Sequence, residues 1–87
     1  MNTPVSPKLD KLLLDMGIDM PVSPTISDVI MWLYEKHGIW ISVDPENDTN
    51  TWFHTITNGK SITAFGSYSG PIEAYEKGIE HVINNLI

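Results

Sequence analysis

The dipeptide Asn58-Gly59 stands between two runs of aromatic and β-branched residues, and no other feature of the sequence limits the fold so narrowly. Both residues tolerate the positive φ angles of the two-residue turn that joins antiparallel strands. Residues 51–57 are therefore expected to form one strand and residues 60–68 the next. With Asn58 and Gly59 at the centre of the turn, Thr57 is expected to face Lys60.

This register predicts aromatic side chains on both faces of the hairpin. The expected pairs are Phe53 with Ala64 and Thr55 with Ile62 on one face, and Trp52 with Phe65 and His54 with Thr63 on the other. An antiparallel sheet that is covered on one side normally has polar residues on its other side. The sequence therefore indicates either a second covering layer or an exposed aromatic patch.

Upstream of the hairpin, the spacing of the apolar residues changes at Gly38 from a helical period to a period of two. Thr25 is expected to cap the start of a helix, and Asp28 is its acidic partner in the first turn of that helix. Gly38 is expected to follow the last residue of the same helix. The alternation over residues 39–43 predicts a strand that Asp44-Pro45 ends.

Both ends of the chain carry a further helix signal. Ser6-Pro7 and Gly17 bracket a short helix that residues 18–24 join to the rest, and Ser69-Gly70-Pro71 opens the last helix. Residues 1–5 are expected to fray. The sequence thus predicts an α+β fold in the order α-α-β-β-β-α, with residues 1–23 as a short N-terminal helix and proline-containing linker and residues 24–87 as a single α-β-β-β-α domain.

The excess of acidic over basic residues argues against nucleic acid as a partner. Eleven Asp and Glu residues oppose five Lys residues, and Arg is absent, which gives a formal net charge of -6. Affinity for nucleic acid comes largely from Lys and Arg, so no nucleic-acid partner is expected. The absence of Cys excludes disulfides and thiolate sites. No segment approaches the roughly 20 apolar residues that span a bilayer, so we expect no membrane partner and a cytoplasmic location.

The α-β-β-β-α order resembles the outline of several small folds, including the double-stranded-RNA-binding domain. That family places basic residues at the start of its last helix, where they bind phosphates. Here that stretch reads Gly70-Pro71-Ile72-Glu73-Ala74-Tyr75-Glu76-Lys77. The resemblance therefore implies an outline of the fold and no RNA binding.

A closer resemblance covers residues 24–87. The residues that carry it are Pro24-Thr25, Val29, Trp32-Leu33, His37, Ile39, Ile41, Pro71, Glu73-Ala74-Tyr75, Gly78-Ile79-Glu80 and Asn85-Leu86-Ile87. In these positions the chain is similar to a group of small proteins of gut Bacteroidetes and their phages and prophages. The resemblance implies a source and a fold shape. It lends no catalytic residue, because no activity is known for that group.

The histidines lack the spacing of a metal site. His37, His54 and His81 include no helical i, i+4 pair; His37 is expected at a helix end and the other two at surface or rim positions. Residues 44–50 alternate oxygen ligands as a calcium loop does, but they lack its glycine and have Thr55 where its bidentate Glu belongs. We therefore expect no metal, no cofactor, no catalytic residue and no enzymatic activity.

Four aromatic residues, Trp40, Trp52, Phe65 and Tyr68, form the candidate interaction surface, because Trp and Tyr are common at interface hot spots. The leading hypothesis is a small non-enzymatic protein of phage or mobile-element type that binds a protein partner or associates with itself.

Two alternative functions rest on other residues. The acidic row Glu73, Glu76 and Glu80 on the last helix suggests a nucleic-acid mimic that inhibits a host enzyme. The three histidines suggest a small metal-dependent enzyme.

Overall fold

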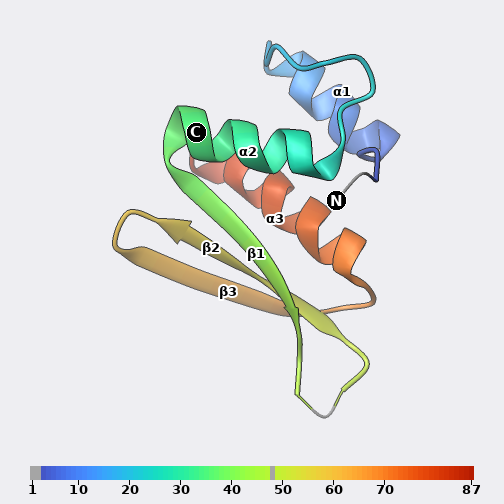
Figure 1. Ribbon diagram of the computed structural model, residues 1–87, viewed down its shortest axis with the longest axis vertical. Helices are drawn as coiled ribbons and strands as arrows, with labels where there is room; N and C mark the ends of the chain where they lie inside the picture. Colours follow the sequence, from blue (N-terminus) through green and yellow to red (C-terminus); the bar gives the residue numbers. More distant parts are fainter. Residues whose placement is uncertain (1–2, 48) are drawn as a thin grey trace.

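The computed structural model describes residues 3–47 and 49–87 and has the α+β order that the sequence predicts. Its elements are α1 (Pro7–Asp15), α2 (Ile26–His37), β1 (Ile39–Pro45), β2 (Trp52–Asn58), β3 (Ser61–Tyr68) and α3 (Pro71–Asn85) (Figure 1). Among the described residues, no helix is long and apolar enough to cross a membrane.

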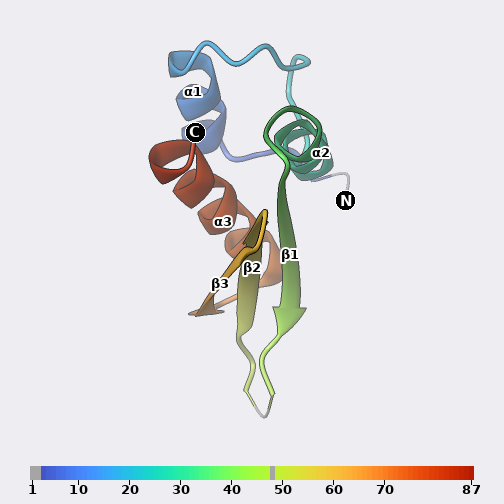
Figure 2. The same cartoon turned by 90° about the vertical axis from the view of Figure 1, so that its left-hand side faces the viewer.

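The strands form one antiparallel sheet in the order β1-β2-β3. The three helices lie on one side of it, with α1 farthest from the strands (Figures 1 and 2). Helix α3 contacts all three strands, whereas α2 contacts β1 and α3. The sheet therefore has a helix side and an outer side, and no described helix or strand covers the outer side.

The capping residues act as the sequence predicts. The side chain of Thr25 accepts from the backbone N–H of Asp28, and the carboxylate of Asp28 accepts from the backbone N–H of Thr25. Ser6 caps α1 with its side chain alone, accepting from the backbone N–H of Leu9 at 3.2 Å. Each cap satisfies backbone donors that have no partner within the helix.

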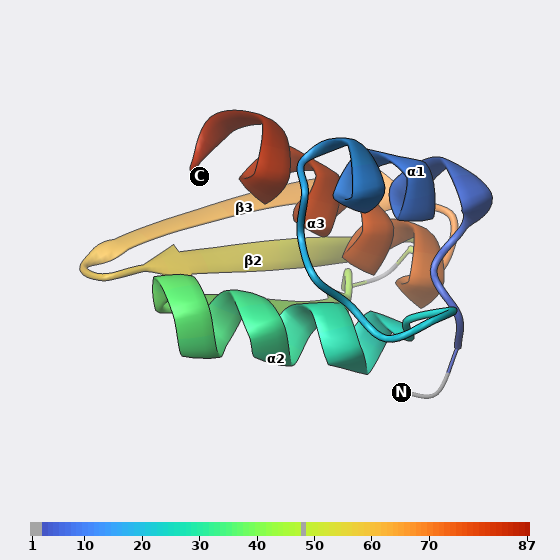
Figure 3. The ribbon, with the colours of Figure 1, turned by 90° about the horizontal axis from the view of Figure 1, so that it is seen from above.

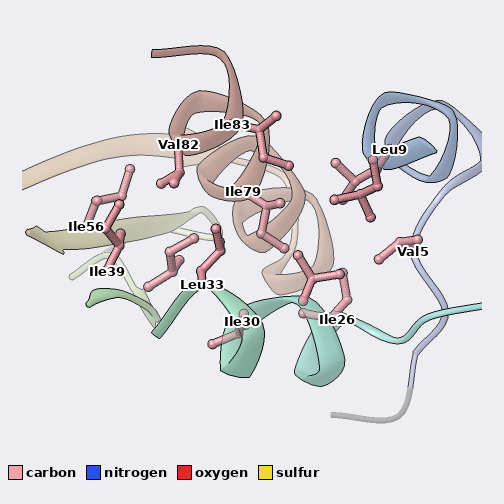
Figure 4. Packing of buried hydrophobic residues seen from close by; sticks show 13 residues of the cluster. Val5, Leu9, Ile26, Ile30, Leu33, Ile39, Ile56, Ile79, Val82 and Ile83 are labelled. Carbon is pink, nitrogen blue, oxygen red and sulfur yellow. The ribbon is translucent and has the colours of Figure 1, made fainter. Parts of the chain in front are cut away.

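The core lies between the sheet and the helices and includes the first helix (Figure 4). Its buried members are Val5, Leu9, Leu13, Ile26, Val29, Ile30, Leu33, Ile39, Ile41, Ile56, Ile79, Val82 and Ile83. Seen from above, α1 lies over α3 (Figure 3). The short N-terminal helix and the rest of the chain thus share one core.

The expectation of a frayed N-terminus is wrong from Thr3 onward; residues 1 and 2 lie outside the described part. The backbone N–H of Val5 donates to the carbonyl of Pro24 at 3.0 Å, and that of Ile26 donates to the carbonyl of Thr3 at 2.9 Å. Val5 is also buried against the core. These contacts join segments about twenty positions apart, which a local reading of the first five residues could not reveal.

The hairpin is confirmed, but its turn lies one residue later than predicted. Asn58 pairs with Ser61 and Thr57 with Ile62, so Gly59 and Lys60 are the central residues. Gly59 has a φ of 61° and Lys60 no positive φ, which is the pattern of a type II′ turn with glycine in first place.

Each predicted partner of a β2 residue is consequently wrong by two positions along β3. Because side chains alternate between faces with a period of two, every side chain still lies on its predicted face. His54 faces Phe65 rather than Thr63, and Thr55 faces Ala64 rather than Ile62. A register shift beyond His54 then brings Trp52 opposite Tyr68.

Candidate functional site

The sheet divides the four candidate aromatic residues between its two sides. Phe65 and Tyr68 line a groove beside α3, and strand alternation places Trp52 on that same side. Trp40 belongs to the outer row with Thr57 and Ile62, but its ring lies at the β1 edge of the sheet, where it packs edge-on against Tyr34 of α2 at 5.5 Å between ring centres. The four residues therefore do not form one continuous surface.

Aromatic rings connect the sheet to α3 in an unbroken series. The ring of His54 stacks on Tyr68, with centres 5.3 Å apart and planes 14° from parallel, and lies 5.6 Å from Phe65. Phe65 in turn lies 5.3 Å from the ring of His81 on α3. His54 is thus enclosed by rings on the side of β3.

His54 is 1% exposed, so its expected surface or rim position is wrong. It lies on β2, the central strand, and faces α3 where Gly78 allows the helix to come close. A β-carbon on Gly78 would be 3.2 Å from Cγ of His54. The burial follows from which side of the sheet is covered, and the hairpin pattern alone left that choice open.

Neither ring nitrogen of His54 forms a hydrogen bond of normal geometry among the described residues, although the backbone carbonyl of Ala74 is close enough to interact with the ring. Burial lowers the pKa of His54 below 6.5; the Ala74 carbonyl opposes this, and the nearby His81 lowers the pKa further. The neutral ring is therefore the form that the fold favours.

The β3–α3 groove is a cavity of about 270 Å³ beside these rings. Its lining residues are His54, Phe65, Tyr68, Lys77, Glu80, His81, Asn84 and Asn85. The strand side is aromatic and the helix side is polar. Sequence reasoning missed the helix side, although Lys77, His81 and Asn84 have the i, i+4, i+7 spacing of one helical face.

Comparisons with family models, with curated proteins and with solved structures found no match.

The described residues contain no group of three or more His, Asp or Glu side chains that could hold a metal ion. His37 lies at the end of α2 against Trp32, with ring centres 5.0 Å apart. In the calcium-like loop, Asp48 lies outside the described residues, and the Glu46 carboxylate accepts from the backbone N–H of Ser67 instead of facing a loop centre.

The acidic row on α3 is held by the chain's own groups. Glu73 accepts from the backbone N–H and hydroxyl of Ser69, which lowers its pKa. Glu76 accepts from the backbone N–H of Ser6 at 2.7 Å, and Glu80 pairs with Lys8 at 3.4 Å. Two of the three carboxylates thus fasten the N-terminal segment to α3.

Strand β3 forms an open edge of the sheet. Among the described residues no strand pairs with its far side, and all its residues except Tyr68 are exposed. Ile62, on the outer side, is 68% exposed, and Phe65, on the helix side, is 44% exposed. This edge and the β3–α3 groove together are the candidate functional site.

Proposed function

We propose that the chain binds an extended segment of a partner protein, which adds as a fourth strand along the open edge of β3. The observation that carries this proposal is the chemistry of that edge. Natural proteins protect edge strands with charged residues, proline, bulges or a covering element. The eight residues of β3 include no charge and no proline, and no described strand covers them. The register shift opposite Trp52–His54 disturbs only the end of β3 beyond Phe65, so residues 61–65 remain a regular, open edge.

The other edge of the sheet is less open. Strand β1 ends in Asp44 and Pro45, and α2 packs beside it. Proline has no backbone N–H to offer to an added strand. Of the two edges of the sheet, β3 is therefore the one more open to an added strand.

The hairpin geometry identifies the backbone groups that are available. In a two-residue hairpin the pair that flanks the turn is hydrogen-bonded, and the two kinds of pair then alternate along the ladder. Counting from the Asn58–Ser61 pair, the amides of Ile62 and Ala64 point away from β2, whereas those of Thr63 and Phe65 point toward it. Ile62 and Ala64 are therefore the expected donors to an added strand.

The surroundings of β3 offer places for the side chains of that segment. Alternate residues of an added strand point to opposite faces of a sheet. One set would contact the β3–α3 groove beside Phe65, and the other would contact Ile62 on the outer side. Backbone pairing with pockets for alternate side chains is a known mode of peptide recognition.

The test begins with a peptide of about ten residues, long enough for one strand, selected from a random display library against the full chain. We expect Ala64→Pro to weaken binding of that peptide at least about tenfold, because proline removes one outward donor and its ring obstructs pairing. The domain should stay folded, since an edge strand tolerates proline where the N–H faces solvent. Calorimetric titration measures the dissociation constants.

Ala64→Ser is the matched control, because it changes the side chain and keeps the amide; we expect its affinity to equal that of the parent. Equal affinity of Ala64→Pro and the parent, or a library that yields no binding peptide, would contradict strand addition. If the chain alone forms a dimer that Ala64→Pro abolishes, the added segment is β3 of a second copy.

A further inference from the structure

The ring of His81 offers a hydrogen-bond donor in the β3–α3 groove. Asn85 Nδ2 donates to the backbone carbonyl of His81 at 3.0 Å, which fixes the orientation of the amide because an amide oxygen cannot donate. The same nitrogen lies 3.4 Å from Nδ1 of His81. With this amide donor beside it, Nδ1 is the accepting nitrogen of the ring and Nε2 is the one that donates.

On the helix side of the groove Lys77 forms no direct ion pair with a described residue, although its charge interacts with the Glu73 carboxylate four positions earlier. Lys77 and Glu80 are the charged lining residues. Glu80 is paired with Lys8, whereas no carboxylate of the described residues lies within ion-pair distance of Lys77 Nζ. Lys77 and the ring of His81 are therefore the groups on this side of the groove that can donate to an anion, while the Glu80 carboxylate is engaged by Lys8.

The opposite side of the groove is a surface for a planar ring. Phe65 is 44% exposed, and Tyr68 lies beside it on the stacked His54 ring. Aromatic rings attract one another in offset or tilted arrangements. The groove is open to solvent and has a volume of about 270 Å³. A molecule of one ring with one small polar group fits this space.

We propose that the β3–α3 groove binds a small aromatic carboxylic acid, with its ring against Phe65 and Tyr68 and its carboxylate toward Lys77 and His81. A carboxylate supplies acceptors to both donors and a charge opposite to that of Lys77. An amine of the same shape would meet Lys77 as a like charge, and a neutral amide lacks the charge. This site does not depend on strand addition at β3.

Benzoate is the probe, titrated into the full chain and followed by NMR at the side chains of Phe65, Tyr68, Lys77 and His81. We expect saturable shifts with a dissociation constant on the order of 1 mM, which is typical of a ligand this small. Lys77→Gln should weaken binding at least about fivefold, because it removes a charged hydrogen-bond donor. The matched control is Lys60→Gln in the hairpin turn, which removes the same charge far from the groove and should leave the affinity unchanged.

Benzamide and benzylamine separate charge from shape, and we expect both to bind at least about fivefold more weakly than benzoate. Binding of benzamide as tight as that of benzoate would overturn the proposal, and so would the absence of saturable shifts up to about 20 mM benzoate.

An equal loss of benzoate affinity in Lys60→Gln and Lys77→Gln would also overturn the proposal. Ala64→Pro should bind benzoate like the parent, so failure of strand addition and failure of the acid site give different results.

Discussion

Substitution of Gly78 by valine is expected to destabilise the domain by about 3 kcal/mol or more, at the upper end of the cost of overfilling a core. A β-carbon at this position would lie 3.2 Å from both Cγ of His54 and Cγ2 of Ile41. Both neighbours are buried on the helix side of the sheet, so neither can move into solvent. Valine adds two further carbons and would force α3 away from β1 and β2. Urea unfolding followed by circular dichroism measures the loss.

Lys77→Val is the control for this experiment. It places the same β-branched residue one position earlier on α3, where the side chain is exposed. We expect its cost to stay within about 0.5 kcal/mol, the usual range for an exposed substitution. A Gly78→Val protein as stable as Lys77→Val would show that the helix does not approach the sheet as closely as described.

The second large effect is expected from His54. Because the pKa of His54 is lowered in the folded chain, the unfolded chain binds more protons at mildly acidic pH. The free energy of unfolding therefore falls as the pH drops through the ordinary histidine value of 6.5. Replacing His54 by leucine removes this proton uptake and also removes two buried nitrogens that form no hydrogen bond of normal geometry among the described residues. We expect His54→Leu to be more stable than the parent by about 1 kcal/mol at neutral pH, with a gap that widens as the pH falls.

Urea unfolding of both proteins between about pH 7.5 and about pH 5.5 tests this, because the range spans the titration of histidine. His37 and His81 are present in both proteins, so the difference between the two profiles isolates the titration of His54. Parallel profiles, or a leucine variant that is less stable than the parent at every pH, would contradict a buried, neutral His54.

The helices and strands could be predicted because their signals are local. Thr25 and Asp28 form the expected reciprocal cap within one turn, and the apolar alternation after Gly38 marks β1. The sequence also predicts the hairpin, but Asn58-Gly59 suits a type I′ turn, whereas the chain uses Gly59 and Lys60 as the central residues, one position later. Gly59 suits the second position of a type I′ turn and equally the first position of a type II′ turn, so the dipeptide allows both registers and the pairing of the whole strands decides between them.

The candidate site was predicted only in part, because it depends on contacts between distant segments. Their aromatic character predicts an interaction role for Phe65 and Tyr68, and both line the groove, whereas Trp40 belongs to the outer row of the sheet. The burial of His54 could not be predicted without knowing which side α3 covers. The Glu76 carboxylate that holds Ser6 spans seventy positions, so the packing of α1 was equally beyond a local reading.

The most direct test of strand addition is amide hydrogen exchange along β3, measured by NMR with and without the selected peptide. In the free chain we expect Thr63 and Phe65 to exchange slowly, because their amides point toward β2, and Ile62 and Ala64 to exchange fast. With the peptide bound, Ile62 and Ala64 should become as slow as their neighbours. If these two amides stay fast while the peptide is bound, the segment does not pair with β3 and the proposed function is wrong.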